Sequence, residues 1–293
     1  MITRRRYKIL VDFEHVYRFL TETYDIETLN SYLLPQFFEY ANMNTFFEFP
    51  KSHHFGIWES DGNIVGIACF EMTIGECLLH THKDYKFLLP EMLEWAELEL
   101  SVIEDDKRKL DVKITDKELD KVKMLKSAGY SFAFSRPIKI FPYTKSFPER
   151  TLPEGFSLID GNNVDYVKLH SVYWKGFDHG DIPDDNYDRR IYEDNAPDID
   201  RSLMTIAVAP DSEYACALGM WYDKANKYAY LEPMATIPKY RRMGLATICL
   251  SEAMKKTKLL GAKYCFCGGR EFYTVFGCET IMNWETWKKE WTP

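Results

Sequence analysis

The chain has 293 residues, of which 46% are hydrophobic and 28% charged, so it can bury a core and is not a disordered polymer. This length suits one large domain or two of medium size. The formal net charge of −8, from 37 basic and 45 acidic residues, argues against a nucleic-acid-binding protein with a basic face. No stretch approaches the roughly 18 consecutive apolar residues that a membrane-spanning helix needs.

The cysteines indicate a reducing compartment. There are seven, an odd number, and Cys69, Cys216 and Cys249 lie inside apolar runs. Scattered thiols of this kind are typical of a cytoplasmic protein. Cys265 and Cys267 alternate in one run, but no second Cys/His pair stands at metal-ligand spacing. We therefore expect a cytoplasmic protein without a metal, and the sequence carries no signal for an oligomeric state.

Apolar spacing and turn residues predict the elements of the first half. Strands are expected at 55–58, 64–70, 76–80, 110–114 and 131–140, and helices at 90–100 and 117–127. The turn Ser-Asp-Gly-Asn at 60–63 separates the first two strands with residues that tolerate positive φ.

A segment rich in proline, with Pro142, Pro148 and Pro153, then interrupts the pattern and predicts a linker. The second half repeats the layout, with strands at 156–159, 203–208, 215–222, 228–237, 264–267 and 279–287 and helices at 164–177, 244–260 and 271–276. A tandem duplication accounts for both halves. We expect an α/β (α+β) fold in which each half is a mixed sheet flanked by helices. The predicted domains are 1–143 and 155–293, joined by the linker 144–154.

Residues 241–247, Arg-Arg-Met-Gly-Leu-Ala-Thr, connect a strand to the longest predicted helix. Backbone amides at a helix start, together with the helix dipole, favour an anion, and Gly244 allows a ligand to approach the backbone. The predicted ligand of this loop is a pyrophosphate. An ordinary strand–turn–helix with solvated basic residues is the alternative that the residues alone leave open.

Arg241-x-x-Gly244-x-Ala246, after a strand ending at Thr236 and before a long helix, resembles the acetyl-CoA loop of the GNAT acetyltransferases. The run 272–278, Phe-Tyr-Thr-Val-Phe-Gly-Cys, is similar to the Tyr-x-x-apolar-Gly-Phe signature that follows the fifth strand in that family. The resemblance covers the second half and, weakly, the first. It implies tandem GNAT-like domains with mostly antiparallel twisted sheets, and acetyl-CoA as cosubstrate.

The resemblance also implies roles for individual residues. Thr236 and Ile237 would end the strand that pairs with the pantetheine arm. The cofactor-binding loop would comprise Arg241, Arg242, Met243, Gly244, Leu245, Ala246 and Thr247. Tyr273 would protonate the departing thiolate, and Glu232 would be the general base. The alternatives are a packing role for Tyr273 and a paired carboxylate for Glu232.

This sequence departs from the family pattern at two places. Cys278 replaces the usual Phe, and 267–270, Cys-Gly-Gly-Arg, stands where the family often has an Asn. The first half departs further: Leu89, Glu91 and Leu125 align with Gly244, Ala246 and Tyr273, so we expect a degenerate copy without the cofactor.

Residues 178–200, which we call the acceptor segment, hold nine acids against Arg189 and Arg190, a charge of −7. Such a stretch attracts cations, and aromatic rings stack on them. We expect a small-molecule, cationic amine as the acceptor, with Trp174, Phe177, Asp181 and Tyr187 as candidate contacts; aminoglycoside-like or polyamine-like molecules fit, and so would a basic peptide terminus. A solvated acidic loop is the alternative. For the whole chain, the prediction is an N-acetyltransferase acting by direct transfer, and the alternative is a non-catalytic CoA-binding regulatory or scaffold protein.

Overall fold

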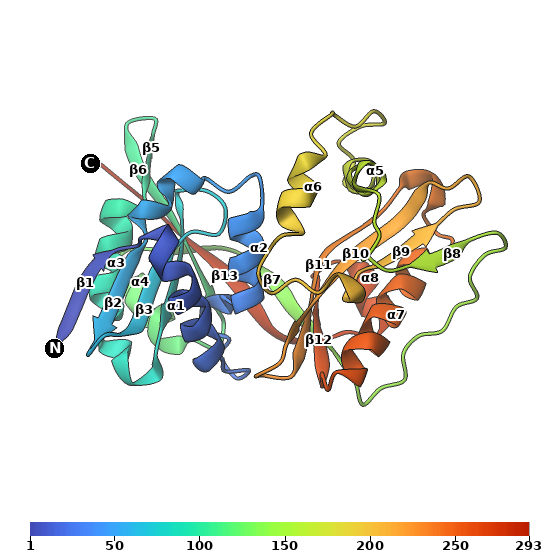
Figure 1. Ribbon diagram of the computed structural model, residues 1–293. Helices are drawn as coiled ribbons and strands as arrows, with labels where there is room; N and C mark the ends of the chain where they lie inside the picture. Colours follow the sequence, from blue (N-terminus) through green and yellow to red (C-terminus); the bar gives the residue numbers. More distant parts are fainter. Residues whose placement is uncertain (293) are drawn as a thin grey trace. The chain divides into compact units, whose positions relative to one another are not determined.

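The computed structural model describes residues 1–292, which divide into two compact units (Figure 1). The first unit comprises Met1–Pro137 together with residues 282–292, and the second comprises Ile138–Ile281. Within the described residues no helix is long and apolar enough to cross a membrane.

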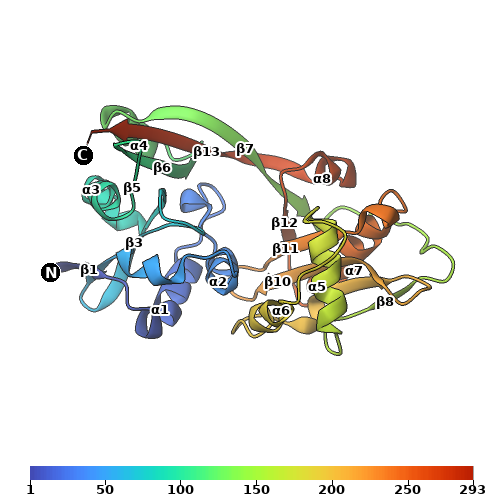
Figure 2. The ribbon, with the colours of Figure 1, turned by 90° about the horizontal axis from the view of Figure 1, so that it is seen from above.

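The first unit is an α/β layer built on a mostly antiparallel sheet. Its strands are β1 (Ile2–Arg6), β2 (Gly56–Ser60), β3 (Asn63–Cys69), β4 (Glu76–Thr81), β5 (Val102–Glu104), β6 (Lys107–Thr115) and the first part of β7 (Ser131–Pro142). Its helices are α1 (Ile9–Glu22), α2 (Pro35–Met43), α3 (Leu89–Glu99) and α4 (Leu119–Ser127). The strand order is β1-β2-β3-β4-β6-β13, and β5 pairs with β6. Figure 2 shows α1 and α3 on opposite sides of these strands.

The second unit repeats this order of elements. Its strands are β8 (Ser157–Ile159), β9 (Thr205–Val208), β10 (Tyr214–Asp223), β11 (Tyr228–Thr236), β12 (Tyr264–Cys267) and β13 (Glu279–Trp291), of which β13 begins here. Its helices are α5 (Tyr166–Gly176), α6 (Asp188–Glu193), α7 (Leu245–Leu259) and α8 (Glu271–Phe276). The strand order is β7-β12-β11-β10-β9-β8.

Side-chain alternation along β10 divides the core of the second unit into two layers. Leu218 packs in the cluster that contains the buried face of α7, whereas Ala217 packs with α5. Successive strand residues point to opposite faces, so α5 and α7 cover opposite sides of the sheet, as Figure 1 shows. Both helices thereby meet the strands that lead into the 241–247 loop.

The two units share one irregularity that matters for the site. In the first unit β4, which precedes α3, pairs in parallel with β6 over three residues only, and in the second unit β11, which precedes α7, pairs in parallel with β12 over three residues only. These are Glu76–Leu78 against Asp111–Lys113 in the first unit, and Tyr228–Tyr230 against Tyr264–Phe266 in the second. The tandem organisation and the mixed-sheet fold class predicted from the sequence are confirmed.

The closing strand of each half of the sequence pairs within the unit formed by the other half. Residues Trp284–Trp291 of β13 pair with β6 of the first unit, and Lys139–Pro142 of β7 pair with β12 of the second. Residues 282–292 therefore complete the first unit, although the sequence places them in the second half. The structure also contains β1, α1, α2 and α6, which the periodicity did not predict.

Candidate active site

The candidate site begins where β11 separates from β12. Their pairing ends at Tyr230 and Phe266, while β11 stays paired with β10 as far as Thr236. Over residues 231–236 the pairing with β12 has ended; we call the side of β11 that faces away from β10 over these residues the 231–236 edge. Such an edge can pair with an extended, amide-bearing ligand.

A β-bulge lies within this edge. The register shifts so that Leu218 opposes Met234 but Met220 opposes Leu231, so that two residues of β11, Glu232 and its neighbour, oppose the single residue Gly219 of β10. The indole nitrogen of Trp221 donates a 3.0 Å hydrogen bond to the Glu232 carbonyl. A bulge changes the direction of the side chains that it carries, so Glu232 does not follow the regular alternation of side chains between the two faces of the sheet.

The two residues predicted to end the pantetheine strand lie in different environments. Thr236 donates its hydroxyl to the Cys216 sulfur at 3.3 Å. The Ile237 amide donates to Ala215 across the sheet, and the Ile237 carbonyl accepts from Tyr240. Because both backbone groups of Ile237 are engaged, an extended ligand would pair with the edge before this residue.

The 241–247 loop has the backbone of an anion-binding turn. Arg242 and Gly244 have φ of +67° and +83°, and α7 starts directly after Gly244. The N-cap residue of this helix is Gly244, which has no side chain to cap it, so within the described residues its first amides, at Leu245, Ala246 and Thr247, have neither a helical partner nor a side-chain cap. Arg242 and Met243 are exposed beside them. The loop can therefore hold a phosphate by its backbone.

Sequence reasoning missed Arg150, which lies at the same loop. A side-chain carbon at Gly244 would stand 3.7 Å from Cγ of Arg150. The linker is held there because the Ser251 hydroxyl of α7 donates to the Pro148 carbonyl at 2.7 Å. Nothing in the local sequence signals this contact, since Arg150 sits in the proline-rich linker, more than ninety residues before the loop.

The guanidinium of Arg241 turns away from the amides of the loop. It bonds to the carbonyls of Thr236 and Gly176 and to the carboxylate of Asp178, at 3.2, 2.9 and 2.8 Å. Its direct contact with a cofactor remains a prediction. In the structure, the side chain joins the end of β11 to the end of α5.

Tyr273 lies in the first turn of α8 and is 9% exposed. Its ring packs against Gly268, where an added side-chain carbon would overlap the ring. Burial raises the pKa of Tyr273 above its ordinary value, and the nearby Glu232 carboxylate raises this pKa further. The phenol therefore stays protonated at neutral pH, as a general acid requires. Cys278, which replaces the family's Phe, is buried with its sulfur 2.8 Å from that of Cys267.

The candidate acceptor contacts are spread along α5 and the acceptor segment. Trp174 lies in α5 under the guanidinium of Arg189, 5.5 Å from the ring centroid. Phe177 stacks on Tyr173 and is 42% exposed, and Asp181 and Tyr187 are exposed on the connection to α6. The ring of Trp174 thus already faces a cation of the chain itself.

Several acids of the acceptor segment have partners inside the second unit. Asp178 pairs with Arg241, and Glu193 pairs with Arg190 at 2.5 Å. Asp184 lies 2.8 Å from His170, and Asp194 lies buried near Arg201. Arg190 is already included in the count of −7, so only the contacts with Arg241 and Arg201, which lie outside the segment, offset part of that charge. Within the described residues no group of three or more His, Cys, Asp or Glu side chains could hold a metal ion.

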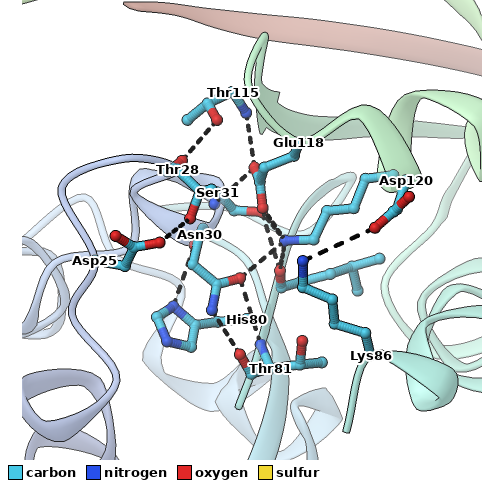
Figure 3. A network of polar contacts seen from close by, with 12 residues as sticks. Asp25, Thr28, Asn30, Ser31, His80, Thr81, Lys86, Thr115, Glu118 and Asp120 are labelled. Carbon is cyan, nitrogen blue, oxygen red and sulfur yellow. Dashed lines mark hydrogen bonds and ion pairs between the residues drawn. The ribbon is translucent and has the colours of Figure 1, made fainter. Parts of the chain in front are cut away.

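In the first unit, polar side chains fill the corresponding gap between β4 and β6 (Figure 3). Ser31 donates its hydroxyl to the Leu79 carbonyl at 3.0 Å, and Asn30 donates its amide to the Thr81 carbonyl at 2.6 Å. The ammonium of Lys121 also donates to Leu79 and pairs with Glu118. These groups use the β4 carbonyls that lie beyond the parallel pairing. This network is a physical reason to expect no pantetheine in the first unit.

The comparisons agree with this architecture. The family model described as Acetyltransferase (GNAT) family matches residues 166–276. A GCN5-related N-acetyltransferase from Sphaerobacter thermophilus is 12% identical with a TM-score of 0.61, over 100% of this chain and 96% of its own. A tandem GNAT protein from the clavulanic acid biosynthesis pathway is 12% identical with a TM-score of 0.60, over 99% of this chain and 98% of its own.

An acetyltransferase of the GNAT family from Colwellia psychrerythraea is 12% identical with a TM-score of 0.59, over 98% of this chain and 99% of its own. No curated protein matches the sequence. At these identities the likeness is one of fold. The fold is that of tandem GNAT domains, as the resemblance of the loop and the 272–278 run implied.

Proposed function

We propose, on the match of residues 166–276 to the GNAT family model, that the protein transfers an acetyl group from acetyl-CoA to an amine. The observation that carries this proposal is the 231–236 edge of β11, which leads directly into the uncapped start of α7. The edge suits an amide-bearing arm, and the amides of the 241–247 loop suit its pyrophosphate. When bound, acetyl-CoA supplies the activated thioester.

Two side chains take the proton-transfer roles in this proposal. Glu232 accepts the proton of the incoming ammonium, directly or through a water molecule. Tyr273 donates its proton to the departing thiolate, and its raised pKa keeps that proton available. Direct transfer needs no covalent enzyme intermediate, so no nucleophilic side chain is required.

We propose a small cationic amine as the acceptor. Asp181, Asp185 and Asp188 are exposed on the acceptor segment, where they attract cations. Phe177 is exposed enough to contact such a ligand.

The test is a thermal-shift measurement with acetyl-CoA, followed by a thiol-release assay over a panel of amines. We expect acetyl-CoA to stabilise the protein against thermal unfolding, and at least one amine to cause release of the free CoA thiol. Stabilisation without release on any amine would favour the CoA-binding scaffold instead. No stabilisation would contradict both proposals.

Gly244→Glu tests the phosphate loop itself. A carboxylate there repels a phosphate, so we expect acetyl-CoA binding to weaken at least about tenfold. Gly62→Glu is the matched control, because Gly62 has a φ of +82° close to the +83° of Gly244 and open space around it. It carries the same backbone strain at a turn of the first unit. If Gly244→Glu and Gly62→Glu bind acetyl-CoA equally well, the loop assignment is wrong.

A further inference from the structure

The guanidinium of Arg241 contacts two segments that the proposed function assigns to different substrates. Its Nε donates to the Thr236 carbonyl at the end of β11, at 3.2 Å. One Nη donates both to the Gly176 carbonyl, at 2.9 Å, and to the Asp178 carboxylate, at 2.8 Å. Gly176 ends α5 and Asp178 begins the acceptor segment, so one side chain joins the cofactor strand to the acceptor segment.

The backbone beneath this side chain is packed without spare room. A side-chain carbon at Gly176 would lie 2.7 Å from the Ala235 side chain and 3.1 Å from the Thr236 nitrogen. Asp178 has a φ of +62°, a left-handed conformation that redirects the chain directly after α5. The direction in which the acceptor segment leaves α5 is therefore fixed at β11 and Arg241.

From this point the contacts continue to α6. The ring of Phe177 stacks on Tyr173 at 6.0 Å, and the guanidinium of Arg190 lies 4.9 Å from the Tyr173 ring centroid. Arg189 lies over Trp174 in the same way. Cation–π contacts thus attach α6 to α5, and a continuous set of contacts runs from Arg241 to α6.

We propose that Arg241 is a positioning residue that couples cofactor binding at the 241–247 loop to the placement of the acceptor segment. The inference rests on the proposed function. A phosphate held by the amides of Arg242–Thr247 fixes the backbone next to Arg241. It thereby fixes the position from which the Arg241 side chain extends to its guanidinium. Coupling of this kind is reciprocal, so bound acetyl-CoA strengthens amine binding and a bound amine strengthens acetyl-CoA binding. The effect is a few-fold, because the pair is solvent-exposed, with 42% of the Arg241 side chain and 66% of the Asp178 side chain accessible.

Hydrogen exchange of the full chain, with and without saturating acetyl-CoA, tests the coupling without knowledge of the amine. In the wild type, we expect acetyl-CoA to slow exchange in residues 242–248 and also, by about threefold or more, in residues 177–194. Asp178→Asn keeps a residue that tolerates positive φ and removes the charge. In this variant the protection of 242–248 should remain, and the protection of 177–194 should fall to less than half.

Asp211→Asn is the matched control. Asp211 lies 3.5 Å from Lys239, just before the 241–247 loop, and 57% of its side chain is exposed. It belongs to the turn between β9 and β10, so this substitution should leave both protections as in the wild type.

The proposal is overturned if wild-type 177–194 gains no protection while 242–248 does, or if Asp178→Asn leaves that protection unchanged. Equal loss in Asp178→Asn and Asp211→Asn would also overturn it. If acetyl-CoA protects neither region of the wild type, the proposed function itself fails, which is a distinct result.

Discussion

At the scale of single residues, the proposed proton-donor role of Tyr273 can be tested separately from acetyl-CoA binding. Tyr273→Phe removes the proton donor and keeps the buried ring, so we expect turnover on the amine found by the panel to fall about 100-fold. The affinity for acetyl-CoA, measured by titration calorimetry, should stay within about twofold. In the wild type, the raised pKa of Tyr273 keeps the phenol protonated, so turnover should not decline through its ionisation below about pH 10.

Tyr222→Phe is the control for this substitution. Tyr222 belongs to the same unit, but its hydroxyl bonds to the Leu260 carbonyl at the far end of α7. Its loss should leave turnover unchanged. Wild-type turnover in Tyr273→Phe would leave Tyr273 with a packing role, the alternative that the sequence left open.

At the scale of elements, we expect the first unit to lose stability in acid, because the 29–32 segment and its neighbours enclose His80, whose Nδ1 lies 3.1 Å from the Asn30 carbonyl. His80 of β4 is buried, its Nε2 lies 2.7 Å from the Thr23 hydroxyl, and burial lowers its pKa to about 3. The unfolded chain takes up this proton near the ordinary value of about 6.5, whereas the folded chain does not. Stability is therefore full above that value and falls with decreasing pH, by about 2 kcal/mol between pH 7 and pH 5.

Unfolding in denaturant at these two pH values, compared with His80→Gln, measures this contribution. Glutamine keeps polar atoms in the network but has no titrating ring, so His80→Gln should be less stable at pH 7 and change less on acidification. An equal loss in both proteins between pH 7 and pH 5 would contradict a neutral, buried His80.

The sequence predicted a structural feature where the residues that form it are neighbours in the chain. Gly244 predicted the turn before α7, because few other residues adopt its φ of +83° without strain. The sequence could not show that Arg241 contacts Gly176 and Asp178, or that Arg150 lies beside Gly244, because these contacts join residues far apart in the chain. For the same reason a charge count over 178–200 could not separate paired acids from exposed ones.

At the scale of the whole molecule, the exchanged strands tie the last residues of the chain to the first unit. Periodicity predicted strands at the ends of both halves, but pairing is decided by packing across the sheet. Trp284 of β13 donates its indole N–H to the Ser31 carbonyl at 3.1 Å and packs edge-on against Tyr32 and Phe37. β13 therefore pairs with β6 within the sheet, and through Trp284 it also packs against the 29–32 segment.

Truncation after Ile281 should consequently destabilise the first unit, although the residues removed follow the second in sequence. Losing a paired strand exposes the β6 backbone and the side chains beneath Trp284, so we expect amide exchange in β4 and β6 to accelerate at least about 100-fold. The amides of β10 and β11, whose neighbouring strands β9 and β12 remain, should change far less. Trp284→Ala is the milder variant: it keeps the strand, removes its largest contact with Tyr32 and Phe37, and should cost about 3 kcal/mol of stability. If truncation instead accelerated exchange in β10 and β11 as much as in β4 and β6, the strand would belong to the second unit and the exchange would be refuted.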